Sequence, residues 1–283
     1  MRLSFILLIF AALSHAQTAF DILLAPIKIQ QGRVTVGKPV NITNRPGYDN
    51  QPSFTPDGSA VLFTSLREDK QADTYRYELK TGRTERLTKT AESEFSPASA
   101  PNGKTFFTVR VEADQTQRLW QFQADGSSPK LVLDGIKPVG YFAFAGSRAV
   151  ALFVLGTPPT LQLADTATGH AEVIASNIGR QILKIPGRHV ISFMEKEADG
   201  VWWIKELDPG SRKVKPIVKA LEGGEYFAWT PGRILLMAKG SKLYQCQLPA
   251  GAEWVEVAEF PQKISRVAVN SRGTQIAVVA EEP

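Results

Sequence analysis

Apolar residues along the chain gather in short runs that are divided by a glycine. Residues 51–63 hold one such run on each side of Asp-Gly at 57–58, and residues 96–107 repeat the arrangement around Asn-Gly at 102–103. These dipeptides between apolar runs predict hairpins, because a type I′ turn needs positive φ at both central residues. We therefore expect a strand, a two-residue turn and a second strand in each segment.

The same pattern continues to the end of the chain at a regular period. Glycines between two apolar runs recur every 41 to 45 residues, and a second set of glycines marks another turn in each unit. The first set is Gly58, Gly103, Gly146, Gly187, Gly232 and Gly273, and the second is Gly82, Gly126, Gly169, Gly210 and Gly251. Two hairpins per unit mean four strands, which is the pattern of a β-propeller. A helical solenoid is excluded, because no unit shows helical spacing and proline and glycine interrupt every run.

The last unit is incomplete, and this predicts how the ring closes. Residues 266–281 supply two strands, and residues 20–29 and 33–43 supply two more, with a small insertion between Gly32 and Ile42. We therefore predict an all-β fold: a six-bladed β-propeller with four-stranded antiparallel blades, the last blade being closed by strands from both termini. Such closure leaves no unpaired edge between blades.

The first two units resemble the WD40-like (PD40) repeat of TolB-type six-bladed propellers. The residues that carry this resemblance are 54–59, 73–79, 81–82 and 86–88. The resemblance is strong over residues 45–133 and is one of pattern alone over residues 134–283. It implies a six-bladed ring, usually exported, whose known roles are mostly protein–protein contacts in the cell envelope.

The amino terminus has the features of a signal peptide. Arg2 is followed by an apolar stretch at 3–13 that is too short to span a bilayer, and small residues stand at 14 and 16. We expect cleavage after residue 16, a single propeller domain over residues 17–283, and a periplasmic or secreted protein with no membrane span. Six blades would then share 267 residues, about 44 each, without room for the separate amino-terminal α/β domain of TolB itself.

Composition and charge narrow the classes of function. The chain is 43% hydrophobic and 22% charged, which indicates a folded core. Its 33 basic and 28 acidic residues are scattered, with a net charge of +5, so we expect no nucleic-acid binding. The single cysteine, Cys246, alternates with Tyr244 and Leu248, and we expect a small buried hydrophobe rather than a nucleophile or half of a disulfide.

Motifs that carry catalysis are scarce. The sequence has no Gly-x-Ser-x-Gly, no Cys/His cluster, no His-Glu-x-x-His and no EF-hand loop. His170 follows a turn glycine and is expected to be solvated, whereas His189 is expected to open a strand within a blade. Trp202 and Trp203 are candidates for a sugar platform, because adjacent strand residues face opposite sides, although packing between blades is the simpler interpretation.

The candidate binding site follows from propeller geometry. Loops from the outer strand of one blade to the inner strand of the next surround one mouth of the central channel, where ligands often bind. The candidate binding residues at this mouth are Tyr48, Asp49, Asn50, Glu94, Tyr141, Arg180, Gln181, Glu225, Tyr226 and Arg266. Tyrosine and arginine often dominate recognition surfaces. The alternative is that these residues cap strands and neutralise one another.

The sequence therefore favours an exported, non-catalytic binding or scaffold protein. Its expected partner is a protein of the cell envelope or a small ligand, and we expect a monomer without a cofactor. The alternative is a hydrolase or lactonase-type propeller enzyme with a divalent metal in the channel. Calcium is the candidate ion for that site, with Asp49, Glu94 or Glu225 as ligands.

Overall fold

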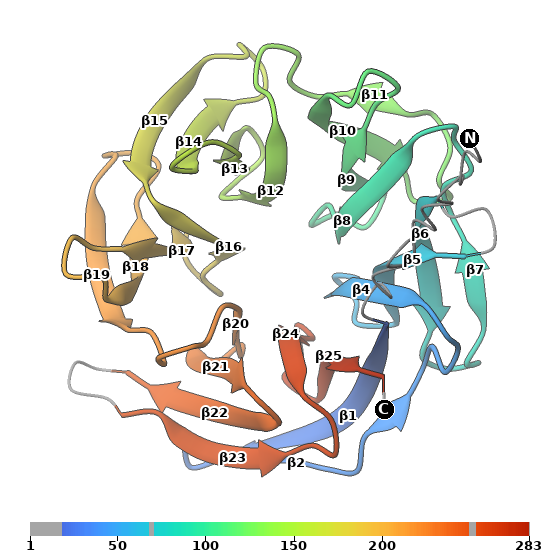
Figure 1. Ribbon diagram of the computed structural model, residues 1–283, viewed down its shortest axis with the longest axis vertical. Coiled ribbons are helices and arrows are strands. Elements are labelled where there is room, and N and C mark those ends of the chain that lie inside the picture. Colours follow the sequence, from blue (N-terminus) through green and yellow to red (C-terminus); the bar gives the residue numbers. More distant parts are fainter. Residues whose placement is uncertain (1–18, 68–70, 249–252, 283) are drawn as a thin grey trace, which may run out of the picture.

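A computed structural model describes residues 19–67, 71–248 and 253–282 of the chain. Every regular element in these ranges is a β-strand, and the strands form sheets arranged around a central axis (Figure 1). The fold is therefore all-β, with four-stranded antiparallel sheets in a propeller of about six blades, as the repeat predicts. The predicted signal peptide, residues 1–16, lies outside the described residues.

Four blades are separate four-stranded antiparallel sheets. Blade II comprises β8 (Ser93–Ser99), β9 (Thr105–Val111), β10 (Gln117–Gln123) and β11 (Lys130–Leu131). Blade III comprises β12 (Val139–Phe144), β13 (Ala149–Val154), β14 (Thr160–Asp165) and β15 (Ala171–Ser176). Blade IV comprises β16 (Ile178–Lys184), β17 (Ile191–Lys196), β18 (Trp202–Leu207) and β19 (Val214–Lys219). Blade V comprises β20 (Phe227–Trp229), β21 (Ile234–Lys239), β22 (Lys242–Gln247) and β23 (Val255–Glu259).

The remaining nine strands form one sheet that divides into blades I and VI. Blade I comprises β4 (Tyr48–Phe54), β5 (Ala60–Leu66), β6 (Ala72–Glu78) and β7 (Thr84–Arg86). Blade VI comprises β24 (Ile264–Val269), β25 (Gln275–Glu281), β1 (Phe20–Gln30), β2 (Arg33–Val36) and β3 (Val40–Asn41). The two blades are joined by a single parallel pair, Phe20 with Tyr48. Blade VI thus contains segments from both ends of the chain, as predicted.

The predicted insertion in blade VI divides its outer strand into two pieces. Both β2 and β3 pair with β1, and β1 pairs on its other side with β25 from Phe20↔Glu281 to Pro26↔Gln275. Between the two pieces, the amide of Gly37 donates to the carbonyl of Pro26 at 2.8 Å. Pro26 cannot donate in return, because proline has no N–H. The segment with the insertion therefore stays beside β1, pairing with it through β2 and again through β3.

The hairpins were predicted correctly, but their turns are not of type I′. In blade I, the amide of Thr55 donates to the carbonyl of Ala60 at 2.9 Å, so the loop is longer than two residues. Gly58 has a positive φ of 68°, and Asp57 is not among the residues with positive φ. The Asp57 carboxylate accepts hydrogen bonds from Ser59 and Thr55, which stabilises a longer loop with one left-handed glycine.

Apolar packing between neighbouring blades is unequal around the ring. The junctions II/III, III/IV, IV/V and V/VI each contain nine to fifteen buried hydrophobic residues. The two junctions on either side of blade I contain four each. Cys246 is fully buried in the IV/V cluster, which confirms its interpretation as a small hydrophobe. None of the described residues forms a helix long and apolar enough to cross a membrane.

Candidate functional site

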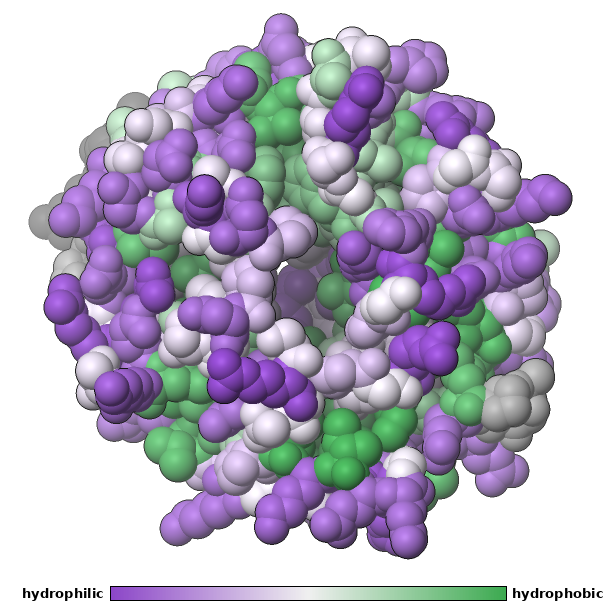
Figure 2. Space-filling model, turned by 180° about the vertical axis from the view of Figure 1, so that it is seen from behind, coloured by the Kyte–Doolittle hydropathy of each residue, from purple (hydrophilic) through white to green (hydrophobic). Residues whose placement is uncertain are grey.

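Two adjoining cavities open where the inner strands of the blades begin. The larger has a volume of about 620 Å³, and its lining includes Tyr48, Phe95, Tyr141, Leu155, Thr157 and Gln117. The smaller has a volume of about 430 Å³, and its lining includes Ile178, Gly179, Met194, Trp202, Gly224 and Glu225. Phe153, Pro159 and Arg180 line both cavities, so we call the two together the mouth groove. One face of the molecule is visibly hollowed at its centre (Figure 2).

A cluster of tyrosines and arginine crosses the channel beside this groove. Arg266 of blade VI donates a hydrogen bond from Nη2 to the Tyr141 hydroxyl of blade III at 2.9 Å. Its guanidinium carbon also lies 4.1 Å from the centre of the Tyr226 ring and 5.1 Å from that of Tyr141. Tyr48 of blade I contacts the Phe20 ring edge to face, with centroids 6.0 Å apart. Predicted residues from several blades therefore meet at the mouth.

Two ionisable groups at the mouth, Tyr48 and Arg180, have raised pKa values. Burial raises the pKa of Tyr48 to about 12, although the positive charge of Arg266 opposes the shift. A hydrogen bond with the Tyr226 hydroxyl is the main reason why the pKa of Arg180 is raised. At neutral pH the Tyr48 hydroxyl is therefore an uncharged donor, and Arg180 is a cation.

Two predicted acidic residues lie inside the protein instead of in the groove. Asp49 is fully buried, and its Oδ2 lies 3.3 Å from Nε of Arg45. Glu94 is also fully buried, with Oε1 at 3.0 Å from Nε of Arg110 and 2.5 Å from the Thr90 hydroxyl. Burial raises the pKa of both carboxyl groups, that of Glu94 to about 7. These side chains belong to the packing between blades.

The other predicted residues are placed as follows. Asn50 is buried and accepts a hydrogen bond from the amide of Gln51. Gln181 is half-buried on β16, one residue beyond Arg180. Glu225 is exposed and lines the smaller cavity. Of the acidic candidates, Glu225 is thus the one that reaches the mouth groove.

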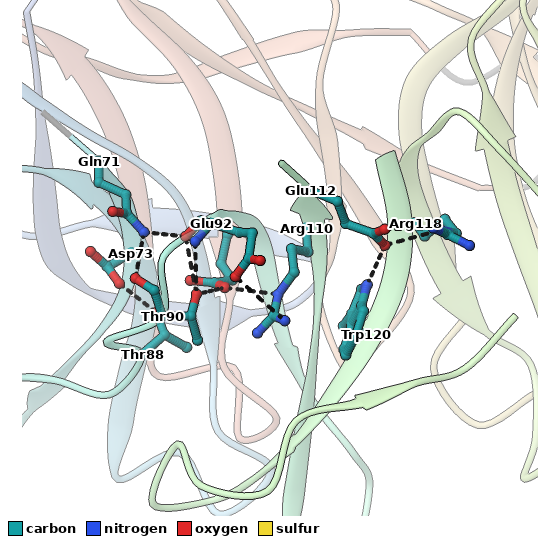
Figure 3. Close-up of polar contacts among 10 residues, drawn as sticks. Gln71, Asp73, Thr88, Thr90, Glu92, Arg110, Glu112, Arg118 and Trp120 are labelled. Carbon is teal, nitrogen blue, oxygen red and sulfur yellow. Dashed lines mark hydrogen bonds and ion pairs between the residues drawn. The ribbon is translucent and has the colours of Figure 1, made fainter. Parts of the chain in front are cut away.

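A polar network joins blades I and II below the mouth (Figure 3). The Thr88 hydroxyl donates to Oδ1 of Asp73 at 3.0 Å, and Arg110 pairs with Glu94. The guanidinium carbon of Arg110 lies 4.2 Å from the centre of the Trp120 ring, which favours a cation–π contact. Charged groups here replace part of the apolar packing found at most other junctions.

A threonine hydroxyl also donates to a buried aspartate between blades VI and I. The Thr43 hydroxyl donates to Oδ1 of Asp21 at 2.7 Å, as Thr88 does to Asp73. Asp49 follows Thr43 by six residues, and Glu94 follows Thr88 by the same number. The inner strands of blades III, IV and VI begin instead with the buried residues Val139, Ile178 and Ile264. Polar junctions of this kind therefore flank blade I.

The predicted metal ligands do not gather in one place. Within the described ranges, no group of three or more His, Cys, Asp or Glu side chains is arranged to hold a metal ion. Asp49 and Glu94 face arginines, whereas Glu225 lies at the exposed rim. His170 is exposed, as predicted, but His189 is exposed in a bend before β17, so its prediction as a strand residue was wrong.

Sequence reasoning missed one wall of the groove. The loop between β13 and β14 contributes Leu155, Thr157 and Pro159, because loops between second and third strands end at the same mouth. The Gly-Thr-Pro-Pro-Thr sequence between two apolar runs was the available signal. The two tryptophans have different surroundings. Trp202 lines the smaller cavity, whereas the centre of the Trp203 ring lies 5.5 Å from Nζ of Lys219.

Comparison with known proteins supports the fold. No protein-family model matches the sequence. A TolB candidate from Agrobacterium tumefaciens is 14% identical, with a TM-score of 0.72 over 93% of this chain and 99% of that chain. TolB from Acinetobacter baumannii is 13% identical, with a TM-score of 0.59 over 93% of this chain and 64% of that chain. An oligogalacturonate lyase in complex with manganese is 16% identical, with a TM-score of 0.56 over 91% of this chain and 78% of that chain.

These similarities define a class of protein by its fold. The chain has the β-propeller fold that TolB-like structures share. Because an enzyme has the same architecture, the fold by itself does not decide between binding and catalysis. The decision has to rest on the groups that line the mouth groove.

Proposed function

We propose that the chain is an exported, non-catalytic binding protein that holds a small ligand or a segment of an envelope protein in the mouth groove. The observation that carries this proposal is the Tyr/Arg cluster beside two joined cavities, to which Tyr48, Tyr141, Tyr226, Arg180 and Arg266 contribute. Such rigid side chains, tied to one another before a ligand arrives, favour recognition because little ordering is left to be done on binding.

The protonation of these groups also supports binding. A general acid or base works best with a pKa near the working pH. Tyr48 has a pKa of about 12, and the pKa of Arg180 is raised, so both keep their protons at neutral pH. They are suited to donate hydrogen bonds rather than to exchange protons with a substrate.

The proposed function is tested by blocking the groove with one matched pair of variants. Leu155 is 41% exposed and lines the larger cavity, whereas Val173 is 59% exposed on β15, the outer strand of the same blade. Leu155→Glu should abolish binding of the ligand or partner that copurifies with the wild type. Val173→Glu should still bind it. Native mass spectrometry and affinity capture from an envelope fraction provide the readout. Equal capture by wild type and Leu155→Glu would contradict the proposal.

A further inference from the structure

Arg180 occupies a distinctive position in the mouth groove. It lines both cavities, is exposed, and lies on β16 between Gly179 and Gln181. Glu225 acts on its charge at longer range, but no carboxylate of the described residues forms an ion pair with Arg180. Other arginines of the described residues do have such partners, for example Arg110 with Glu94 and Arg118 with Glu112. Arg180 shares a hydrogen bond with the Tyr226 hydroxyl, but a guanidinium that faces a cavity without a carboxylate partner favours an anion from outside.

Hydrogen-bond donors lie near Arg180 at the mouth. The Tyr48 hydroxyl stays protonated at neutral pH, since its pKa is about 12, and the Arg266 guanidinium is already engaged with Tyr141 and Tyr226. A ligand with hydrogen-bond acceptors therefore suits this part of the groove. Glu225 at the edge of the smaller cavity disfavours a ligand with several negative charges, because like charges repel at short range.

The walls on either side of Arg180 are largely apolar. Met194 and Trp202 line the smaller cavity, and Phe153 lies between the two cavities. A Cβ atom on Gly179 would lie 3.0 Å from Cβ of Met194 and 3.5 Å from the Trp202 ring, so the glycine keeps this wall open. The cavity volumes of about 620 and 430 Å³ fall in the range of small-molecule sites, roughly 300 to 1,000 Å³.

We infer that the mouth groove takes a small organic acid, and that Arg180 binds its carboxylate while its apolar or aromatic part occupies the neighbouring cavity. This inference rests on the proposed function and adds the chemical class of the ligand. Arg180 presents parallel N–H donors that match the two oxygens of a carboxylate. Trp202 and Phe153 provide flat faces for the apolar part.

The test compares two probes of nearly equal size and shape, one of which is charged and the other neutral. The probes are 3-phenylpropanoate and the uncharged 3-phenylpropanamide, and their dissociation constants are measured by calorimetry and by ligand-observed NMR. We expect wild-type protein to bind the acid about ten-fold more tightly than the amide, because a hydrogen bond to a charged group is worth more than a neutral one. The preference should shrink at high salt, because the groove is open to solvent.

The matched variants are Arg180→Gln and Arg33→Gln. Both remove one positive charge from an exposed side chain, but Arg33 lies on β2 at the outer edge of blade VI. Arg180→Gln should bring the two dissociation constants to within about two-fold, while Arg33→Gln should keep the wild-type preference. Thermal unfolding of both variants verifies that they fold.

The outcomes separate this inference from the proposed function. Equal binding of acid and amide by the wild type would overturn the carboxylate inference and leave a groove that binds ligands. A preference that survives in Arg180→Gln would overturn the assignment to Arg180. Binding of neither probe at millimolar concentration would overturn the proposed ligand class, and the Leu155→Glu and Val173→Glu pair would then decide independently whether the groove binds anything.

Discussion

Glu94 is a carboxyl group enclosed between blades I and II. Burial raises its pKa to about 7 from an ordinary value of 4.5, although the Thr90 hydrogen bond and the charge of Arg110 act in the opposite direction. Because this pKa is higher in the folded chain, the folded state keeps a proton that the unfolded state releases between these two pH values. The contribution to stability is therefore fully present below pH 4.5 and is lost as the pH rises through about 7.

Replacement of Glu94 by glutamine should remove this pH dependence. The free energy of unfolding of the wild type, relative to Glu94→Gln, should fall by at most roughly 3 kcal/mol between pH 4.5 and pH 8, since one pKa unit corresponds to about 1.4 kcal/mol. Urea unfolding at several pH values measures this difference in the free energy of unfolding. Glu85→Gln, at a side chain 45% exposed, is the control. A gap between wild type and Glu94→Gln that stays constant with pH would contradict the role of Glu94.

Neighbouring residues at the start of β4 explain why the candidate site was predicted only in part. Tyr48 lines the mouth groove, but Asp49 points into the protein, because successive residues of a strand face opposite sides. The sequence indicates which loops reach the mouth, and so Tyr48 and Arg180 were found. It does not indicate which side chain of an adjacent pair turns inward, and so Asp49 and Glu94 were included with them.

Among the elements, the outer edge of blade VI shows which features of a blade the repeat pattern can predict. The pattern predicts an insertion before Ile42, and the structure divides the strand into β2 and β3, both paired with β1. The period alone could not predict this, because the division depends on where Pro26 leaves the ladder without a donor. The turn at Asp57 is similar, since a side-chain hydrogen bond decides between a short and a long loop.

The β1 edge also depends on Thr43, and this yields a prediction for stability. Thr43→Val removes the hydrogen bond to Asp21 and leaves the amide of Ile22 without its side-chain acceptor. The free energy of unfolding should fall by about 1 to 3 kcal/mol, as expected for buried polar groups without partners. Chemical denaturation is the measurement, and Thr35→Val, at an exposed position on β2, is the matched control. Equal effects of the two substitutions would show that Thr43 has no special role.

At the scale of the whole molecule, the ring depends on the antiparallel pairing of β1 with β25. Removal of residues 275–283 would leave β1 with an unpaired side and expose Ile22 and Leu23, which are buried on opposite faces of the sheet. We expect the shortened chain to lose cooperative unfolding and to aggregate, as measured by near-ultraviolet circular dichroism and light scattering. Removal of Glu282 and Pro283 alone is the control. A cooperative transition with the wild-type midpoint in the shorter chain would contradict this expectation.

The same pairing sets an order of events for the nascent chain. Ile22 finds its partner Val279 only after about 257 further residues have been made, which takes on the order of tens of seconds at ordinary rates of synthesis. Blades II to V can form from local contacts during that time, whereas β1 has to wait. Contacts between such distant residues are slow to form, because the entropy of closing a long loop must be overcome first. A chain interrupted near its end would therefore carry several folded blades and one strand, β1, with an unpaired edge and exposed apolar side chains. Chaperones and proteases recognise such segments.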